Sequence, residues 1–273
     1  MKTFSKIYMI TVFLFLYAPI MVMVVFSFNG INSTGLFQGF SFRWYEELFQ
    51  NRAVLNALKN SLILAVLSSL ISTVLGTLAA VGINRMRHSW IKGPTMMLTD
   101  IPMMNPDIVT GISMMLLFVF VGKFVLGGNS IMGFWSLLIA HTTFNLPYVI
   151  MSILPKLRQM DPKLTEAAMD LGCTPAKAFV KVVLPFISSG VIAGMMMAFT
   201  LSLDDFVISY FVNGSNFQTL PILIYAMTKK RVRPTINALS TIIFTVVLIL
   251  LIITNAVQSR GEKKNIKKKG IRQ

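Results

Sequence analysis

Long apolar runs separated by short polar segments dominate the chain. Six of these runs are about 20 to 25 residues long, the length that a helix needs to cross the hydrocarbon core of a bilayer. Because lipid offers no partners to backbone N–H and C=O groups, each run is predicted to be an α-helix. The predicted spans cover residues 7–28, 60–84, 98–121, 131–153, 187–211 and 236–257. The pattern therefore predicts an all-α, polytopic membrane protein with one transmembrane domain over residues 1–273.

The first apolar run, from Ile7 to Phe28, is preceded by two lysines. It is too long for the apolar core of a signal peptide, and no small-x-small cleavage site follows it. We therefore expect it to be retained as the first span. The polar segment 29–59 follows as a long outer loop. Its FRWYEELFQN stretch predicts a short interfacial helix on which Trp44, Tyr45, Leu48 and Phe49 can share one face.

The composition supports a membrane protein, and the distribution of Lys and Arg over the loops predicts its orientation in the membrane. The chain is 55% hydrophobic and only 13% charged, with a mean hydropathy of +0.70. Its formal charge of +15 would suit nucleic acid, but the predicted loops divide the Lys and Arg residues 17 to 8 in favour of the side that holds both termini. This asymmetry predicts cytoplasmic termini. The basic tail, 258–273, is then a topology anchor near anionic lipid, and we expect no nucleic-acid partner.

One loop, 161–185, carries unusually clear helix signals. Asp161 and Pro162 form a capping residue followed by a favoured first helical residue. Gly172 provides a left-handed stop. Thr174 and Pro175 begin a second short helix in the same way. The first helix has an apolar stripe at helical spacing, made of Leu164, Ala167, Ala168 and Leu171.

Two interpretations of this cytoplasmic loop follow from spacing alone. Its amphipathic helices could fold back on their own bundle, which is common for such segments. Alternatively, the small side chains of Ala167 and Ala168 permit close approach by another surface, and Glu166 offers it a charge. The second interpretation makes the loop a docking element for a cytoplasmic partner.

The residues of this loop also carry a family motif. Glu166-Ala167-Ala168, then Gly172 and the terminal Leu184-Pro185, match the EAA motif of ABC importer permeases, with Val182 where the motif favours Ile. Further matching segments are SFN after the first span, PDIV at 106–109, LSLDDFV at 201–207 and LPILIY at 220–225. Together these segments extend over most of the chain, which resembles the spermidine/putrescine (PotC-like) permeases.

The resemblance implies a type I importer permease fold and a set of partners. These are a dimer of ATP-binding subunits, a second homologous permease (PotB-like) and an extracytoplasmic substrate-binding protein (PotD-like), assembled in the cytoplasmic membrane of a bacterium. In that family the EAA loop is a coupling helix that sits in a cleft of the ATPase. By position, the coupling residues here are Glu166, Ala167, Ala168, Asp170 and Gly172.

Carboxylates within apolar spans are candidates for function, because each costs about 2.5–3.5 kcal/mol at mid-bilayer. Asp100 lies near a span end and is expected to be interfacial. Asp107 follows two prolines that should interrupt the third span, and Asn105 is expected to cap a helix that restarts at Pro106. Asp107 in the first turn would be stabilised by the helix dipole. It could also face a cation, because broken helices near the midplane form substrate sites.

Asp204 and Asp205 lie in the outer part of the fifth predicted span. On a helix they point about 100° apart, so one can face a pathway while the other pairs within the bundle. Carboxylates beside aromatic rings suit a polyamine, whose amines are cationic and whose methylenes are apolar. The predicted pathway residues are Asp107, Tyr148, Asp204, Asp205 and Tyr210, with Phe206 nearby.

Several chemistries find no support in the sequence. No GxxxxGK[ST] segment occurs, so the chain is expected not to be an enzyme, and ATP with Mg²⁺ would bind the partner ATPase instead. His88, His141 and Cys173 lack ligand spacing, so neither a metal site nor any cofactor is expected in this chain. The many methionines are interpreted as adaptable apolar filler.

The sequence therefore predicts the permease subunit of an ATP-driven importer for polyamines, working by alternating access. Importers of another small solute, either a metal cation or an anion, remain an alternative. The cores of the third and fifth predicted spans contain no Lys or Arg, which argues against an anion. An ion-coupled secondary transporter and a membrane scaffold without cargo are further alternatives.

Overall fold

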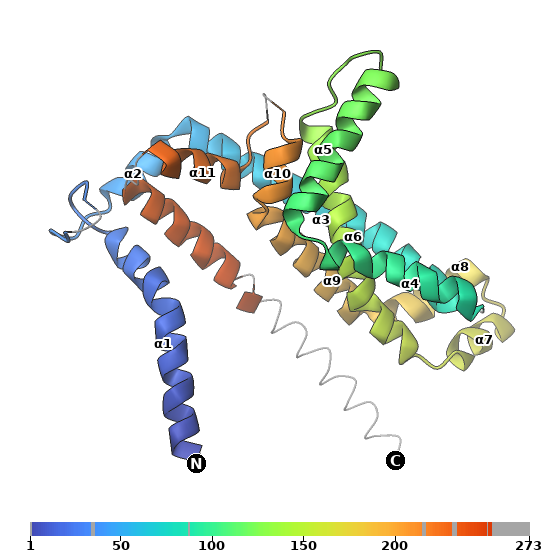
Figure 1. Cartoon of the computed structure of the whole chain (residues 1–273). Coiled ribbons are helices and arrows are strands. Elements are labelled where there is room, and N and C mark those ends of the chain that lie inside the picture. Colours follow the sequence, from blue (N-terminus) through green and yellow to red (C-terminus); the bar gives the residue numbers. More distant parts are fainter. Residues whose placement is uncertain are drawn as a thin grey trace. The chain divides into compact units, whose positions relative to one another are not determined.

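The computed structural model describes residues 2–33, 36–86, 88–214, 217–230, 234–249 and 251–252. Within these ranges the regular structure is helical, joined by turns and irregular segments, with an isolated bridge between Asn29 and Phe40, and Figure 1 shows the helices in order. Five helices are long and apolar enough to cross a membrane. They are Lys6–Phe26, Arg52–Arg85, Asp107–Phe124, Phe134–Arg158 and Pro175–Asp204. The predicted all-α membrane fold is confirmed at this level.

The chain divides into two compact units. The first contains Met1–Ala57 and Ile222–Leu251, and the second contains Leu58–Pro221 and Ile252–Gln273. The first unit holds α1 (Lys2–Phe26), α2 (Arg43–Gln50) and the apolar helix Pro234–Ile249. That last helix overlaps the predicted sixth span, 236–257, of which residues 250 and 253–257 fall outside the described residues.

The loop that follows α1 is built around Asn29, whose side chain is buried. Its amide donates to the carbonyls of Ser33 and Leu36, and its oxygen accepts from the Gln38 N–H. The Trp44 indole donates to the Asn29 carbonyl at 2.6 Å, which ties α2 to this loop. The predicted short helix is thus present as α2, with Trp44 and Leu48 buried and Phe49 59% exposed.

The second unit contains the predicted coupling loop and the predicted pathway residues. Its longer helices and the short α10 are α3 (Arg52–Arg85, beginning in the first unit), α4 (Ser89–Met104), α5 (Asp107–Phe124), α6 (Phe134–Arg158), α9 (Leu184–Asp204) and α10 (Val207–Val212). Between α6 and α9 lie α7 (Lys163–Asp170), α8 (Pro175–Ala178) and the π-helical turn η1 (Phe179–Val183). Helix α11 (Leu220–Lys230) begins in this unit and continues into the first.

Helix α6 lies at the centre of the second unit and packs along α9 (Figure 1). Glycines allow this close approach. A Cβ on Gly76 of α3 would lie 2.6 Å from the Val149 side chain of α6, and one on Gly190 of α9 would lie 2.8 Å from the Ser152 carbonyl. Small residues of this kind let transmembrane helices approach backbone to backbone. Helix α6 is thus held between two neighbours and provides a rigid base for the side chains that it carries.

Two predicted spans are interrupted in the structure. The third, 98–121, is divided at Asn105–Pro106 between α4 and α5, as its prolines predicted. However, Asn105 ends α4 and does not cap α5 as predicted. The capping position of α5 is Pro106, which makes no side-chain hydrogen bond. The fifth, 187–211, was expected to be continuous but breaks at Asp205–Phe206. Helix α11 was not predicted either.

Candidate functional site: a coupling helix and a capped break in the bundle

The predicted coupling helix exists as α7 and has well-formed ends. The Asp161 carboxylate accepts the Lys163 N–H at 3.0 Å, although Pro162 occupies the capping position itself. At the other end Gly172 adopts φ +84°. The Cys173 N–H donates to the Ala168 carbonyl at 3.1 Å. This is the Schellman arrangement that the glycine predicted.

The surface of α7 is open. None of its residues is buried, and Glu166, Ala167 and Asp170 are exposed. Leu171, the last residue of the predicted apolar stripe, is 87% exposed. Leu164 at the other end of the stripe is also exposed. Of the predicted stripe, Leu164, Ala167 and Leu171 are thus exposed and Ala168 is partly buried.

The second helix of the loop differs from its prediction. Thr174 and Pro175 do begin α8, and the Thr174 hydroxyl accepts the Lys177 N–H at 3.4 Å. However, α8 is not a separate short helix. It passes through the π-helical turn Phe179–Val183 directly into α9, giving one 30-residue helix, Pro175–Asp204. Pro185 directly follows this π-helical turn, and the helix continues through it although the proline has no N–H to donate to the preceding turn. The coupling loop thus connects directly to the helix that carries Asp204.

Asp107 and Tyr148 are brought near each other. Asp107 is exposed in the first turn of α5. Its carboxylate lies close enough to the Tyr148 hydroxyl of α6 for the two groups to interact electrostatically. One turn along α5, a Cβ on Gly111 would lie 2.9 Å from the Phe211 ring, so α5 packs tightly on α10. Two of the predicted pathway residues therefore belong to one region.

The two adjacent carboxylates at the end of α9 have different environments. Asp204 is the last residue of α9 and is exposed. The Asp205 side chain is only 8% exposed. Its carboxylate accepts the backbone N–H groups of Ile208 at 3.3 Å and Ser209 at 2.8 Å. Asp205 therefore caps the start of α10, which explains why the fifth predicted span breaks here, since a side-chain acceptor competes with the helical carbonyls.

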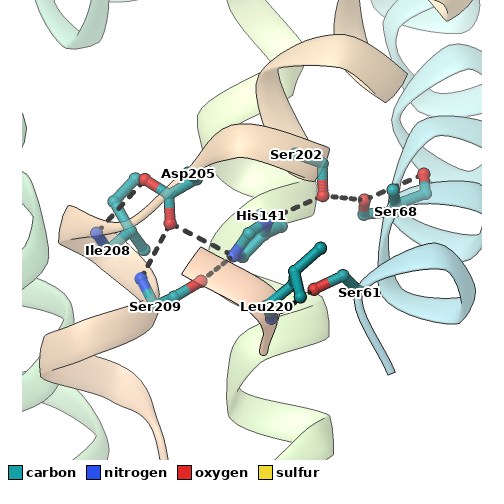
Figure 2. Close-up of polar contacts among 9 residues, drawn as sticks. Ser61, Ser68, His141, Ser202, Asp205, Ile208, Ser209 and Leu220 are labelled. Carbon is teal, nitrogen blue, oxygen red and sulfur yellow. Dashed lines mark hydrogen bonds and ion pairs between the residues drawn. The ribbon is translucent and has the colours of Figure 1, made fainter. Parts of the chain in front are cut away.

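A buried histidine crosses this break (Figure 2). His141 of α6 is 1% exposed. Its Nδ1 lies 2.7 Å from the Ser202 hydroxyl of α9, and its Nε2 lies 3.0 Å from the Ser209 hydroxyl of α10. The same Nε2 lies 3.4 Å from the Asp205 carboxylate. Ser68 of α3 donates to Ser202 at 2.9 Å. Side chains of α3, α6 and the α9–α10 segment, which are distant in sequence, therefore meet in one polar network.

Sequence reasoning missed the partners in this network. His141 was considered only as a metal ligand, and the serines were not singled out. The available signal was the cost of a polar ring in the middle of an apolar span, which requires internal partners. Within the described ranges, no three His, Cys, Asp or Glu side chains gather as a metal site would require.

Tyr210 lies on the exposed side of α10. Its side chain is 49% exposed. Its ring packs against Phe206 at 5.4 Å and against Phe211 at 5.6 Å between centroids. Of the five predicted pathway residues, Asp107, Asp204 and Tyr210 are thus exposed and Tyr148 is half-buried. The Asp205 carboxylate is bonded to the backbone of α10 and lies beside His141 of α6.

Known proteins resemble this chain over nearly its whole length. The putrescine transport system permease protein PotI of Escherichia coli (strain K12) is 40% identical over 256 residues, which cover 93% of this chain and 90% of that protein. The spermidine/putrescine transport system permease protein PotC of the same organism is 38% identical over 94% of this chain and 95% of its own length. A PotC homolog of Mycoplasma genitalium is 30% identical over 92% of this chain and 90% of its own length.

Solved structures share the fold. A crystal structure of a bacterial ABC transporter involved in the import of the acidic polysaccharide alginate contains a chain with a TM-score of 0.73. The match covers 96% of this chain and 95% of that one at 16% identity. An amino acid ABC transporter crystallised with histidines gives a TM-score of 0.58 at 20% identity, over 80% of this chain and 98% of that one. At these identities the likeness concerns the fold alone.

The family is shown by its sequence profile as well as by these relatives. The profile described as binding-protein-dependent transport system inner membrane component matches residues 72–264. That range includes the open helix α7 and the capped break between α9 and α10. The chain therefore belongs to the family of binding-protein-dependent transport system inner membrane components.

Proposed function

We propose that this chain is the permease subunit of an ATP-driven importer for polyamines, putrescine or spermidine, and that it works by alternating access. The observation that carries the proposal is the identity of 40% and 38%, over more than nine-tenths of the chain, to permeases named for putrescine and for spermidine/putrescine transport. The exposed carboxylates in the second unit supply a chemistry that suits such cargo.

The cargo would meet carboxylates and aromatic rings together. Asp107 and Asp204 are exposed, Tyr148 lies near Asp107, and Tyr210 presents half of its side chain. An amine of a polyamine can pair with a carboxylate, while its methylenes and remaining charge contact the ring faces. We assign direct contact with cargo to Asp204 and not to Asp205, because the Asp205 carboxylate is already bonded to α10.

The free energy for transport would come from ATP hydrolysis in another subunit. The exposed α7, with Glu166, Ala167, Ala168, Asp170 and Gly172, would dock on an ATP-binding subunit that holds ATP and Mg²⁺. Since α8 is continuous with α9, movement of the docked loop would be transmitted along one helix to Asp204. The complete importer would also contain a second homologous permease and an extracytoplasmic substrate-binding protein. The chain itself would not be an enzyme.

The topology of the proposal has six spans, of which the sixth extends over 236–257. Both termini and the loop 161–185 would be cytoplasmic, and the tail 258–273 would lie against anionic lipid of the bacterial inner membrane. The two compact units would form one permease domain, 1–273, because α3 and α11 each continue from one unit into the other.

Uptake into vesicles tests this function. The chain, its second permease and the ATPase are reconstituted, and labelled putrescine and spermidine are offered with the binding protein. We expect uptake that requires ATP hydrolysis. Uptake without ATP would support an ion-coupled transporter instead. If neither polyamine is taken up but a metal cation or an anion is, the chain belongs to an importer of that other solute.

A further inference from the structure

The break between α9 and α10 is bridged by one side chain from outside it. The imidazole of His141 contacts Ser202 before the break through Nδ1 and Ser209 after it through Nε2. All three side chains are buried. Asp205, inside the break, shares the Nε2 side of the ring at 3.4 Å. We call these four residues, His141, Ser202, Asp205 and Ser209, the clamp.

The donors and acceptors of the clamp can all be matched with a neutral ring. Ser68 donates to Ser202, whose own hydroxyl hydrogen is then free to point at Nδ1. This leaves Nε2 protonated and facing the Ser209 hydroxyl and the Asp205 carboxylate. The tautomer is assigned here from the pattern of partners. Each side of the ring therefore holds a different helix, α9 through Nδ1 and α10 through Nε2.

The residues of the clamp are next in sequence to two exposed residues at this break. Asp204 comes immediately before Asp205, and Tyr210 comes immediately after Ser209. Neither belongs to the clamp, and both are exposed. The direction in which each points depends on how α9 ends and how α10 begins. Since α10 has only six residues, it has little helical stability of its own and depends on such contacts.

We propose that His141 is a positioning residue of the transport pathway, holding α10 on the end of α9 so that Asp204 and Tyr210 face the cargo together. Its Nε2 side fixes α10 and its Nδ1 side fixes α9. The statement about cargo rests on the proposed function. The statement about α10 does not, since it concerns contacts within this chain.

Two substitutions separate the sides of the ring. The amide of His141→Gln reaches the place of Nε2 and can keep the bonds to Ser209 and Asp205. The amide of His141→Asn reaches only the place of Nδ1 and keeps the bond to Ser202. Hydrogen exchange of the complete importer in lipid nanodiscs is measured for residues 207–212. We expect exchange about tenfold faster in His141→Asn, as loss of the buried hydrogen bond to Ser209 and of the contact with the Asp205 carboxylate implies, and close to wild type in His141→Gln.

His88→Asn and His88→Gln are the matched controls, because His88 is exposed and makes no capping hydrogen bond at the start of α4. They should leave exchange over 207–212 unchanged. Equal exchange in His141→Asn and His141→Gln, whether both match wild type or both are accelerated, would overturn the proposal. In those cases the hydrogen bonds on the Nε2 side of the ring would not be what holds α10.

Putrescine uptake by the same variants tests the role in transport. Counted per assembled importer, His141→Asn should raise the half-saturating concentration about fivefold to tenfold with little change in the maximal rate, and His141→Gln should restore the wild-type value. A change in the maximal rate alone would overturn the positioning role. If the wild-type importer takes up no polyamine, the proposed function fails, and the exchange measurement still decides whether His141 holds α10.

Discussion

The two ends of the long helix Pro175–Asp204 interrupt regular structure in opposite ways. At its beginning the chain turns through α7, whose side chains are all at least partly accessible, and through the π-helical turn Phe179–Val183. At its end the chain breaks at Asp205, where the neighbouring polar groups are buried and bonded to each other. The interruption at the beginning leaves the side chains of α7 accessible, whereas at the Asp205 break the polar groups form hydrogen bonds within the chain.

The difference follows from what surrounds each end. A segment that receives a partner, as we propose for α7, has to leave its apolar and charged side chains uncovered, as Leu171 and Glu166 are. A backbone break inside a membrane bundle cannot rely on water for its free N–H groups, so side chains must replace the missing carbonyls. Asp205 does this for Ile208 and Ser209. The comparison predicts that substitutions at the break will destabilise the fold, whereas those at the open loop will affect function first.

The largest effect is expected for Asp205→Ala at the buried break. The change removes two bonds to backbone N–H groups and leaves Nε2 of His141 without its carboxylate. Losing the hydrogen bonds to a charged acceptor and leaving buried N–H groups unpaired costs about 3 kcal/mol. Thermal unfolding of the purified permease and the amount of assembled importer in membranes should both fall. Asp204→Ala should change stability by less than about 0.5 kcal/mol, because that residue is exposed. Equal losses for both would remove the distinction between the two carboxylates.

Glu166→Lys at the open loop should come next, and it should act on coupling. The exposed carboxylate becomes an ammonium at the proposed docking surface, where a misplaced charge weakens binding. We expect ATP-driven uptake to fall about tenfold, equivalent to about 1.4 kcal/mol, with insertion and thermal stability unchanged. ATP hydrolysis should persist without uptake. Glu166→Gln keeps the shape and should lose less. Normal uptake by Glu166→Lys would exclude Glu166 from docking.

The open loop was largely predictable because its signals are local. Asp161, Gly172 and Thr174 each act within four residues of their own position, and the structure places all three at helix ends. What the sequence could not show was the continuity of α8 with α9. A proline at 185 favours a helix start, but it is equally compatible with the first turn of a helix that is already running through a π-helical turn.

The buried break was predictable only in part, since its partners come from separate helices. The LSLDDFV segment draws attention to Asp204 and Asp205, yet nothing local places His141 beside Asp205. That contact depends on how α6 packs on α9, which is set by close approaches such as Gly194 against Val149. The division of the third span at Pro106 needed only local information, and it was predicted correctly.

Gly172→Ala should have a moderate effect on the open loop. Gly172 adopts φ +84°, a region in which a Cβ costs about 1 kcal/mol. The strain should loosen the end of α7 and raise hydrogen exchange at Cys173, whose N–H bonds to Ala168. Gly172→Asn is the matched control, because asparagine tolerates this conformation better than alanine. The same increase in both variants would show that the backbone conformation is not the cause.

The smallest effect is expected for Thr174→Ala at the start of α8. The Thr174 hydroxyl accepts the Lys177 N–H at 3.4 Å, a long bond whose loss should cost about 0.5 kcal/mol, the lower end of the range for capping residues. Hydrogen exchange at Lys177 should rise about twofold, and Thr174→Ser should prevent the rise because it keeps the acceptor. The effect should stop before Ile187, which is fully buried in the core shared by α6 and α9. An effect that extends to Asp204 would contradict the separation of the two ends and would show that α9 transmits even a small change at its start.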